Sequence, residues 1–321
     1  MTFFPTIVSG PILRYSSFSK YLKKKEITAQ SIAIGFRRFT VGLAKKVIIA
    51  NQLSTLVNAA FDIHCKLSTP LAWLSSIAFM LQLYYDFSGY SDMAIGIGTM
   101  IGFEIPENFN YPYSSHSIQE FWQRWHMSLG SWFKDYVYIP LGGNRVSKVR
   151  WMINTMIVWA LTGLWHGSTL MFVIWGIGHG LINIIEDAIH RLIPSYQKMK
   201  FLSPLRIFIN FMLVSILWVF FKSGSMNEAI SFFQSIFISS KITNTYLFEH
   251  ISQNELLWTF VLLGIVIITD ICRYYTDMIT FLSKRIFIIR WLFYIVLILF
   301  AIVFGVYGPG YHAQDFIYVT F

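Results

Sequence analysis

The strongest constraint in this sequence is an uncharged run of 35 residues, 151–185, that holds two histidines, His166 and His179. The run contains no Asp, Glu, Lys or Arg. It is long enough for two short helices in a bilayer core, which takes roughly 20 mostly apolar residues per helix. A protonatable ring at that depth costs free energy unless something pairs with it, so an intramembrane histidine is by default a candidate functional residue. Imidazole can also accept and return a proton near neutral pH.

The composition indicates an integral membrane protein without a sizeable soluble domain. Of the 321 residues, 55% are hydrophobic and only 13% are charged, whereas soluble domains carry about 25% charged residues. We therefore expect a single membrane domain over residues 1–321. The net charge of +9 does not imply a nucleic-acid partner, because the basic residues lie between apolar runs, as in cytoplasmic loops that face anionic lipids. Cys65 and Cys272 form no disulfide or metal-binding motif.

Other apolar segments extend the helical pattern and predict an all-α, polytopic fold with roughly six to eight membrane-embedded helices. A segment near the N-terminus, residues 27–50, interleaves four basic residues with apolar ones, so we interpret it as an amphipathic helix at the interface or beside a cavity. The expected spans besides 151–185 are residues 67–85, 207–221, 256–269 and 291–307.

The middle of the chain, residues 104–150, contains three prolines, many aromatic residues and an amphipathic stretch at 119–136. Irregular backbone at membrane depth is tolerated only where it lines a cavity or packs in protein, so we expect this segment beside a reaction chamber. A helix here would put Trp122, Trp125 and His126 on one face. The alternative is an interfacial helix in which the histidine is incidental, since Trp and Arg are common anchors at that depth.

Other polar residues allow both functional and structural interpretations. His166 could be a packing histidine bonded to a carbonyl. His179 is flanked by glycines that permit close helix approach, which favours a structural or supporting role. Asp86 and Asp92 could form a polar lining, or mark a cap and a break between two helices, and we favour the break.

The sequence contains no standard cofactor signature. It lacks a phosphate-cradling glycine loop ahead of a helix, a zinc-ligand spacing and a nucleophile elbow. We therefore expect no bound cofactor and no metal. From the residues alone, two candidate histidines in a membrane protein are compatible with acyl transfer, with proton-coupled transport, or with neither.

Several motifs in order resemble the membrane-bound O-acyltransferase family, in the branch of the bacterial alginate O-acetyltransferase membrane subunit. The resemblance covers nearly the whole chain. The residues that carry it are 3–12, 42–51, 85–102, 106–112, 121–143, 164–167 and 175–180.

The resemblance implies a helical ring around a central catalytic chamber in a multi-pass protein of the bacterial plasma membrane. His166 corresponds to the family's invariant catalytic histidine and His126 to a second important one. We expect His166 to act as general base, and His126 to orient the acceptor or steady the oxyanion. The expected residues of the chamber or its support are His179, Asp86, Ser128 and Trp165.

The implied reaction is transfer of an acyl group, which we expect to be acetyl, from acetyl-CoA or an acylated thioester carrier. The expected acceptor is an extracytoplasmic polysaccharide, such as alginate or another exopolysaccharide, or a periplasmic or extracellular acetyltransferase- or esterase-like partner that relays the group. The alternatives are D-alanyl transfer to teichoic acid and a truncated, non-catalytic membrane protein. A transporter would more often show inverted repeats, and none is visible.

Three features depart from the family pattern. Met1 almost abuts the first motif, where the family usually has several more membrane helices, so an N-terminal truncation is expected. Lys134 stands where the family often has Arg. The tail, residues 316–321, resembles the family's C-terminal motif in altered form.

The basic loops predict one orientation. Residues 23–25, 148–150 and 284–290 should lie on the cytoplasmic side, because the excess of Lys and Arg sets topology. By the same tendency the loop 239–255 and the C-terminus should face outward. Cysteines introduced into the three basic loops should resist an impermeant thiol reagent in intact cells and react after permeabilisation. Strong labelling of any one of them in intact cells would contradict this topology.

Overall fold

The computed structural model describes residues 3–23, 27–62, 67–193, 199–238, 252–275 and 285–305. Helices and turns make up these residues, and no strand occurs among them, so the expected all-α class is confirmed. The chain divides into two compact units. Unit 1 comprises Met1–Asp62, Ala78–Glu107 and Asn244–Thr320, and unit 2 comprises Ile63–Ile77 and Asn108–Thr243 with Phe321.

Several sequence predictions fall outside the described residues. They concern Cys65, most of the loop 239–255, the tail 316–321, and the basic residues 24, 25 and 284. The predicted topology and the single membrane domain stay predictions.

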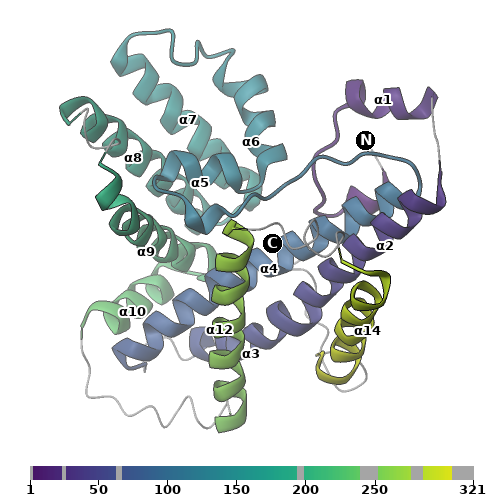
Figure 1. The fold of residues 1–321 in the computed structure, drawn as a ribbon. Coiled ribbons are helices and arrows are strands. Elements are labelled where there is room, and N and C mark those ends of the chain that lie inside the picture. Colours follow the sequence, from purple (N-terminus) through teal and green to yellow (C-terminus); the bar gives the residue numbers. More distant parts are fainter. Residues whose placement is uncertain are drawn as a thin grey trace. The chain divides into compact units, whose positions relative to one another are not determined.

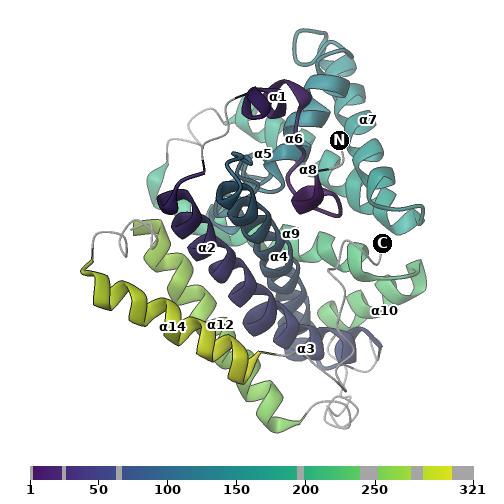
Figure 2. The same cartoon turned by 90° about the vertical axis from the view of Figure 1, so that its right-hand side faces the viewer.

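Unit 1 is built on two long helical stretches that run side by side, as Figure 2 shows for α2 and α4. A capping box at Thr28 begins α2, in which the Thr28 side chain accepts from the Ser31 backbone N–H at 3.0 Å. α14 packs against α2, and α12 packs against α3. The helices are α1 (Tyr15–Lys23), α2 (Ala29–Ala44), a π-helical segment (Lys45–Ala50), α3 (Asn51–Asp62), α4 (Thr69–Met100, which begins in unit 2), α12 (Gln253–Tyr275) and α14 (Phe287–Phe304).

Glycine lets α2 and α4 approach until their backbones touch. A Cβ added to Gly42 would lie 2.6 Å from the carbonyl oxygen of Gly89, and a Cβ added to Gly89 would lie 2.8 Å from that of Gly42. A second pair makes the same reciprocal contact. Gly35, seven residues before Gly42 in α2, faces Gly96, seven residues after Gly89 in α4. Small residues at a helix–helix contact are a common means of close packing in membranes.

The expected helix break at residues 84–92 is wrong, because α4 continues from Thr69 to Met100. The two carboxylates are satisfied within the helix pair instead. Lys46 Nζ lies 2.5 Å from Asp86 Oδ1, and Lys45 Nζ lies 2.6 Å from Asp92 Oδ2. Arg38 also donates to Asp92 Oδ1 at 2.7 Å. Since a buried carboxylate is tolerated when a cation pairs with it, α4 does not have to end to expose these groups.

Unit 2 contains the uncharged run, which forms two helices as predicted. α7 ends at His166 and α8 begins at Leu170, and the two pack closely along their length (Figure 1). α8 also packs against α9. The helices are α5 (Ile118–Arg124), α6 (Met127–Phe133), a π-helical segment (Lys134–Tyr138), α7 (Lys148–His166), α8 (Leu170–Leu192), α9 (Ser203–Lys222) and α10 (Met226–Phe237).

No single helix runs through residues 119–136, which was the condition for Trp122, Trp125 and His126 to share one face. α5 ends at Arg124, Trp125 is extended, and His126 has φ 44° and ψ 53°, in the left-handed region. Trp122, Trp125 and His126 therefore do not share a helical face. A residue with a Cβ rarely adopts this conformation unless its surroundings enforce it, and such residues cluster at functional sites.

Three helices of the described part of the chain are long and apolar enough to cross a membrane: Leu170–Leu192, Ser203–Lys222 and Phe287–Phe304. They coincide with the second half of the uncharged run and with the segments predicted at 207–221 and 291–307. The prediction that the other helices are embedded as well remains untested.

The glycine contact between α2 and α4 generates a stability prediction. Gly42→Ala should lower the thermal stability of the protein in detergent, because overpacking typically costs about 1–3 kcal/mol and the nearest obstacle is backbone. Gly264→Ala in α12 is the matched control, since a Cβ there meets nothing within 4 Å and alanine favours helix. Equal melting temperatures for the two variants would contradict the close contact.

Candidate functional site

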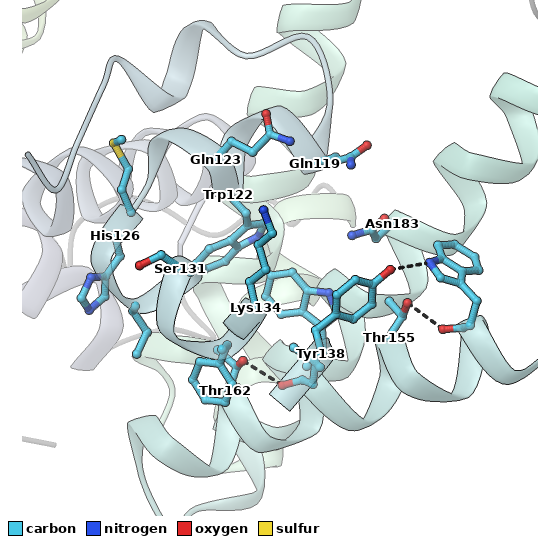
Figure 3. A pocket seen from close by; sticks show the side chains of 17 residues that line it. Gln119, Trp122, Gln123, His126, Ser131, Lys134, Tyr138, Thr155, Thr162 and Asn183 are labelled. Atoms are coloured by element: carbon cyan, nitrogen blue, oxygen red, sulfur yellow. Dashed lines mark hydrogen bonds between the residues drawn. The ribbon is translucent and has the colours of Figure 1, made fainter. Parts of the chain in front are cut away.

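Unit 2 contains a cavity of about 550 Å³ between α5, α6, the π-helical segment, α7 and α8. Figure 3 shows His126 at one side of the group of lining side chains and Asn183 at the other. Its walls combine aromatic rings with amides and hydroxyls, a surface suited to an amphipathic substrate. The lining residues are Gln119, Trp122, Gln123, His126, Met127, Leu129, Gly130, Ser131, Phe133, Lys134, Tyr138, Trp151, Thr155, Val158, Trp159, Thr162 and Asn183.

His126 is buried at the wall of this cavity, with 3% of its surface exposed. Its Nδ1 atom lies 3.1 Å from the side-chain oxygen of Asn108. Burial lowers the pKa of His126 well below its ordinary value, and a positive charge on His166 would lower it further. The ring is therefore neutral at physiological pH, and a neutral imidazole can accept a proton or a hydrogen bond.

His166 is the last residue of α7 and lies among aromatic side chains. It is buried, with 7% of its surface exposed. Its ring centre lies 5.0 Å from that of Trp175 and 5.2 Å from that of Phe221. Trp165 links the two candidate histidines, because its ring lies 4.8 Å from His166 and 6.0 Å from His126. Both rings therefore lie near that of Trp165. We expected the two histidines to face one cavity, because each is costly in an apolar setting unless it pairs. His126 lines the cavity described above and His166 does not, so a shared cavity stays a prediction.

His179 is fully buried on α8 and held by a tryptophan. The Nε1–H of Trp122 donates to Nδ1 of His179 at 3.1 Å. Because Nδ1 accepts, the proton of the neutral ring sits on Nε2. His179 does not line the cavity, whereas Trp122 does. This contact is compatible with the predicted supporting role of His179.

The remaining predicted residues have different surroundings. Ser128 is buried two residues after His126 and contacts Asn108 through both its hydroxyl and its backbone N–H. Trp165 is half exposed. Asp86 lies in unit 1, paired with Lys46. Their predicted place around a substrate chamber stays a prediction.

α5 is tied to α8 at the end opposite His126. The carboxylate of Glu186 accepts from the backbone N–H of Ile118 at 2.8 Å and from that of Gln119 at 3.4 Å. Within α5, Glu120 accepts from the backbone N–H of His116, which precedes the helix, at 2.7 Å. Burial by itself would raise the pKa of Glu120, but contacts with His116 and Arg124 outweigh it and lower that pKa. These contacts fix the start of α5 and so the approach of the chain to His126.

The lining of the cavity also includes a lysine side chain, Lys134, and a phenol, Tyr138. Tyr138 accepts from the Nε1–H of Trp151 at 3.1 Å. Burial raises the pKa of Tyr138, the hydrogen bond from Trp151 lowers it, and the charge of Asp187 raises it, with a net upward shift. Tyr138 therefore stays protonated and can donate.

Asn108 is the site residue that the sequence prediction missed. It belongs to the proline-flanked motif 106–112, which was noted only as a motif. The usable signal in the sequence is an amide side chain within an irregular, proline-rich segment, because such a side chain needs a hydrogen-bond partner if it is buried. Its partner His126, 18 residues away, cannot be identified from the sequence.

In the described part of the chain, no group of three or more His, Cys, Asp or Glu side chains could hold a metal ion.

Comparison with known proteins places these features in context. A family model described as MBOAT, membrane-bound O-acyltransferase family, matches residues 1–226. The chain is 42% identical over 234 residues to the probable alginate O-acetylase AlgI of Pseudomonas aeruginosa, covering 73% of this chain and 44% of the relative. For the peptidoglycan O-acetyltransferase of Helicobacter pylori the identity is 39% over 236 residues, covering 72% and 44%.

A further relative carries a different printed activity. The chain is 36% identical over 193 residues to the teichoic acid D-alanyltransferase of Bacillus subtilis, covering 56% of this chain and 48% of the relative. The chain thus spans less than half the length of each of these three relatives.

The Trp122–His179 hydrogen bond generates a prediction about stability. Trp122→Phe should lower the free energy of unfolding by about 1–3 kcal/mol, because it leaves a fully buried ring nitrogen without its donor. Trp151→Phe is the matched control: Trp151 also lines the cavity and donates one hydrogen bond, but its partner Tyr138 is only half buried. Denaturant unfolding in detergent would measure both. A larger loss for the Trp151 variant would contradict this account.

Proposed function

The chain belongs to the membrane-bound O-acyltransferase family, and from this premise we propose that it transfers an acetyl group from a thioester donor to a hydroxyl group. The observation that carries the proposal is the pair of buried histidines, His126 and His166, whose rings both lie near that of Trp165, with His126 at the wall of a cavity. A non-catalytic membrane protein would have no need to bury two imidazoles together, since polar side chains are costly in an apolar setting.

In the proposed reaction His166 acts as general base. It takes the proton of the acceptor hydroxyl while the hydroxyl oxygen attacks the thioester carbonyl carbon. The new carbon–oxygen bond forms, the carbon–sulfur bond breaks, and the proton passes to the departing thiolate. A positioned base typically contributes about 10²–10⁴-fold in rate. His126 orients the acceptor or steadies the developing oxyanion, the latter being a contribution of about 10²–10³-fold.

The donor and acceptor follow from the proposed chemistry. Acetyl-CoA and acylated carriers both hold the acyl group as a thioester and both carry phosphate, which Lys134 in the lining of the cavity could attract. We propose an extracytoplasmic polysaccharide, or a partner protein that relays the acetyl group to one, as the acceptor. A site among membrane helices would let the donor enter from the cytoplasm and the acceptor from the other side.

D-alanyl transfer is the second candidate, favoured by the relative from Bacillus subtilis. It would use the same attack on a thioester, but the acyl group carries an ammonium. The two relatives named as acetyl-transferring proteins align over a larger share of this chain, 73% and 72% against 56%. We therefore propose acetyl transfer as the principal activity.

Substitutions at the two histidines test the proposal. His166→Ala and His166→Gln should both abolish acyl transfer, because an amide keeps hydrogen bonding and similar bulk but cannot take a proton. His126→Ala should lose most activity, whereas His126→Gln should keep part of it if hydrogen bonding is its task. The measurement is the acetyl content of the exported acceptor, normalised to the amount of protein in the membrane. Near-normal acetylation by the His166→Gln variant would rule out general-base catalysis by this residue.

A further inference from the structure

The hydrogen bonds around Asn108 identify which of its side-chain atoms faces His126. The backbone N–H of Ser128 points to Asn108 Oδ1 at 3.2 Å, and a backbone N–H can only donate. The atom at that position is therefore the amide oxygen, not the nitrogen. The hydroxyl of Ser128 donates to the same oxygen at 2.8 Å. The oxygen 3.1 Å from His126 Nδ1 is consequently an acceptor.

This assignment settles the tautomer of the ring. A hydrogen bond between Nδ1 and an oxygen that only accepts requires the proton on Nδ1. In the neutral ring, Nε2 then carries the lone pair. We propose that Asn108 is a positioning residue that holds His126 in the Nδ1–H tautomer, so that Nε2 accepts a hydrogen bond from a hydroxyl of the acceptor substrate.

The catalytic part of this inference rests on the proposed function and decides between the two roles left open for His126. A neutral ring protonated on Nδ1 cannot donate through Nε2 to an oxyanion. It can receive a hydroxyl hydrogen and so orient the substrate. The acceptor class that fits has a second hydroxyl beside the attacking one, as a sugar ring does. His126 would hold that second hydroxyl while His166 takes the proton of the first.

The backbone supports the same arrangement. The carbonyl of Asn108 accepts from the N–H of Met127 at 2.9 Å, and the N–H of Asn110 donates to the carbonyl of Arg124 at 2.9 Å. These bonds bracket His126 from both sides and hold it in the left-handed conformation. Asn108 thus fixes both the backbone and the ring of His126. On α7, His166 is a titratable group whose charge acts on His126.

The tautomer can be read without any assay of acyl transfer. Nitrogen NMR of the full chain in lipid bilayers, with ¹⁵N-labelled histidine, distinguishes Nδ1–H from Nε2–H, and His126→Gln identifies the signals of His126. We expect Nδ1–H in the unmodified protein and a shift toward Nε2–H in Asn108→Ala. Asn154→Ala is the matched control, because it removes another buried amide, which donates to the carbonyl of Leu141. It should leave the signals unchanged. Nε2–H in the unmodified protein, or no change in Asn108→Ala, would overturn the proposal.

Asn108→Asp tests the substrate role and keeps an oxygen for the N–H of Ser128, so it remains informative if the alanine variant fails to fold. A carboxylate beside the ring should raise the pKa of His126, because the opposite charge stabilises the protonated ring. Protonation removes the lone pair on Nε2, so the KM for the acceptor should rise as pH falls through this raised pKa, by about tenfold for one lost hydrogen bond.

The outcomes of the kinetic experiment separate the two claims. A KM for the acceptor that does not depend on pH in Asn108→Asp, with transfer intact, would overturn the role of Asn108 and leave the proposed function standing. If the unmodified protein shows the Nδ1–H signal but no acyl transfer, the proposed function is overturned. The role of Asn108 in setting the tautomer of His126 would still be supported.

Discussion

Pairing of buried polar groups is the constraint on which the rest of this structure depends. Inside a bundle of apolar helices, a charge or a ring nitrogen must find its partner within the protein, because water is not there to supply one. In unit 1 the carboxylates of α4 meet this requirement with Lys45 and Lys46. In unit 2 the Nδ1 atoms of His126 and His179 meet it with Asn108 and Trp122. The same requirement thus produces buried ion pairs between helices in unit 1 and hydrogen-bonded histidine rings of fixed orientation in unit 2.

Local signals in the sequence predicted the helices well but not the places where distant partners intervene. The uncharged run 151–185 forms two helices, as its length indicated, and α7 ends at His166 immediately before Gly167. The continuous α4 was not predicted, because Asp, Ser and Gly in one segment are equally typical of a helix end. The carboxylates of α4 are paired by cations of α2 and its π-helical extension, which lie 40 to 54 residues away in the chain.

The break at His126 is the opposite case, in which contacts with a distant residue interrupt a helix. The amphipathic pattern of residues 119–136 is compatible with one helix, but the deciding interactions come from Asn108. A left-handed histidine costs of order 1–3 kcal/mol, which no local pattern would favour. The sequence predicted that His126 and His166 face one cavity, because each is costly alone, and this stays a prediction. It could not indicate that Trp165 contacts both rings or that a single amide sets the tautomer.

The strained histidine makes physical sense if its ring has to be presented in one orientation. Had α5 run on through residue 126, the ring would sit on a helix side and its nitrogens would be free to exchange roles. Ending α5 at Arg124 and restarting at Met127 points the ring at the cavity and brings Nδ1 to an oxygen that only accepts. The backbone strain is offset by hydrogen bonds formed before any substrate arrives. Groups oriented in advance lose no reorganisation energy at the moment of reaction, and this is the advantage that an irregular segment beside regular helices can supply.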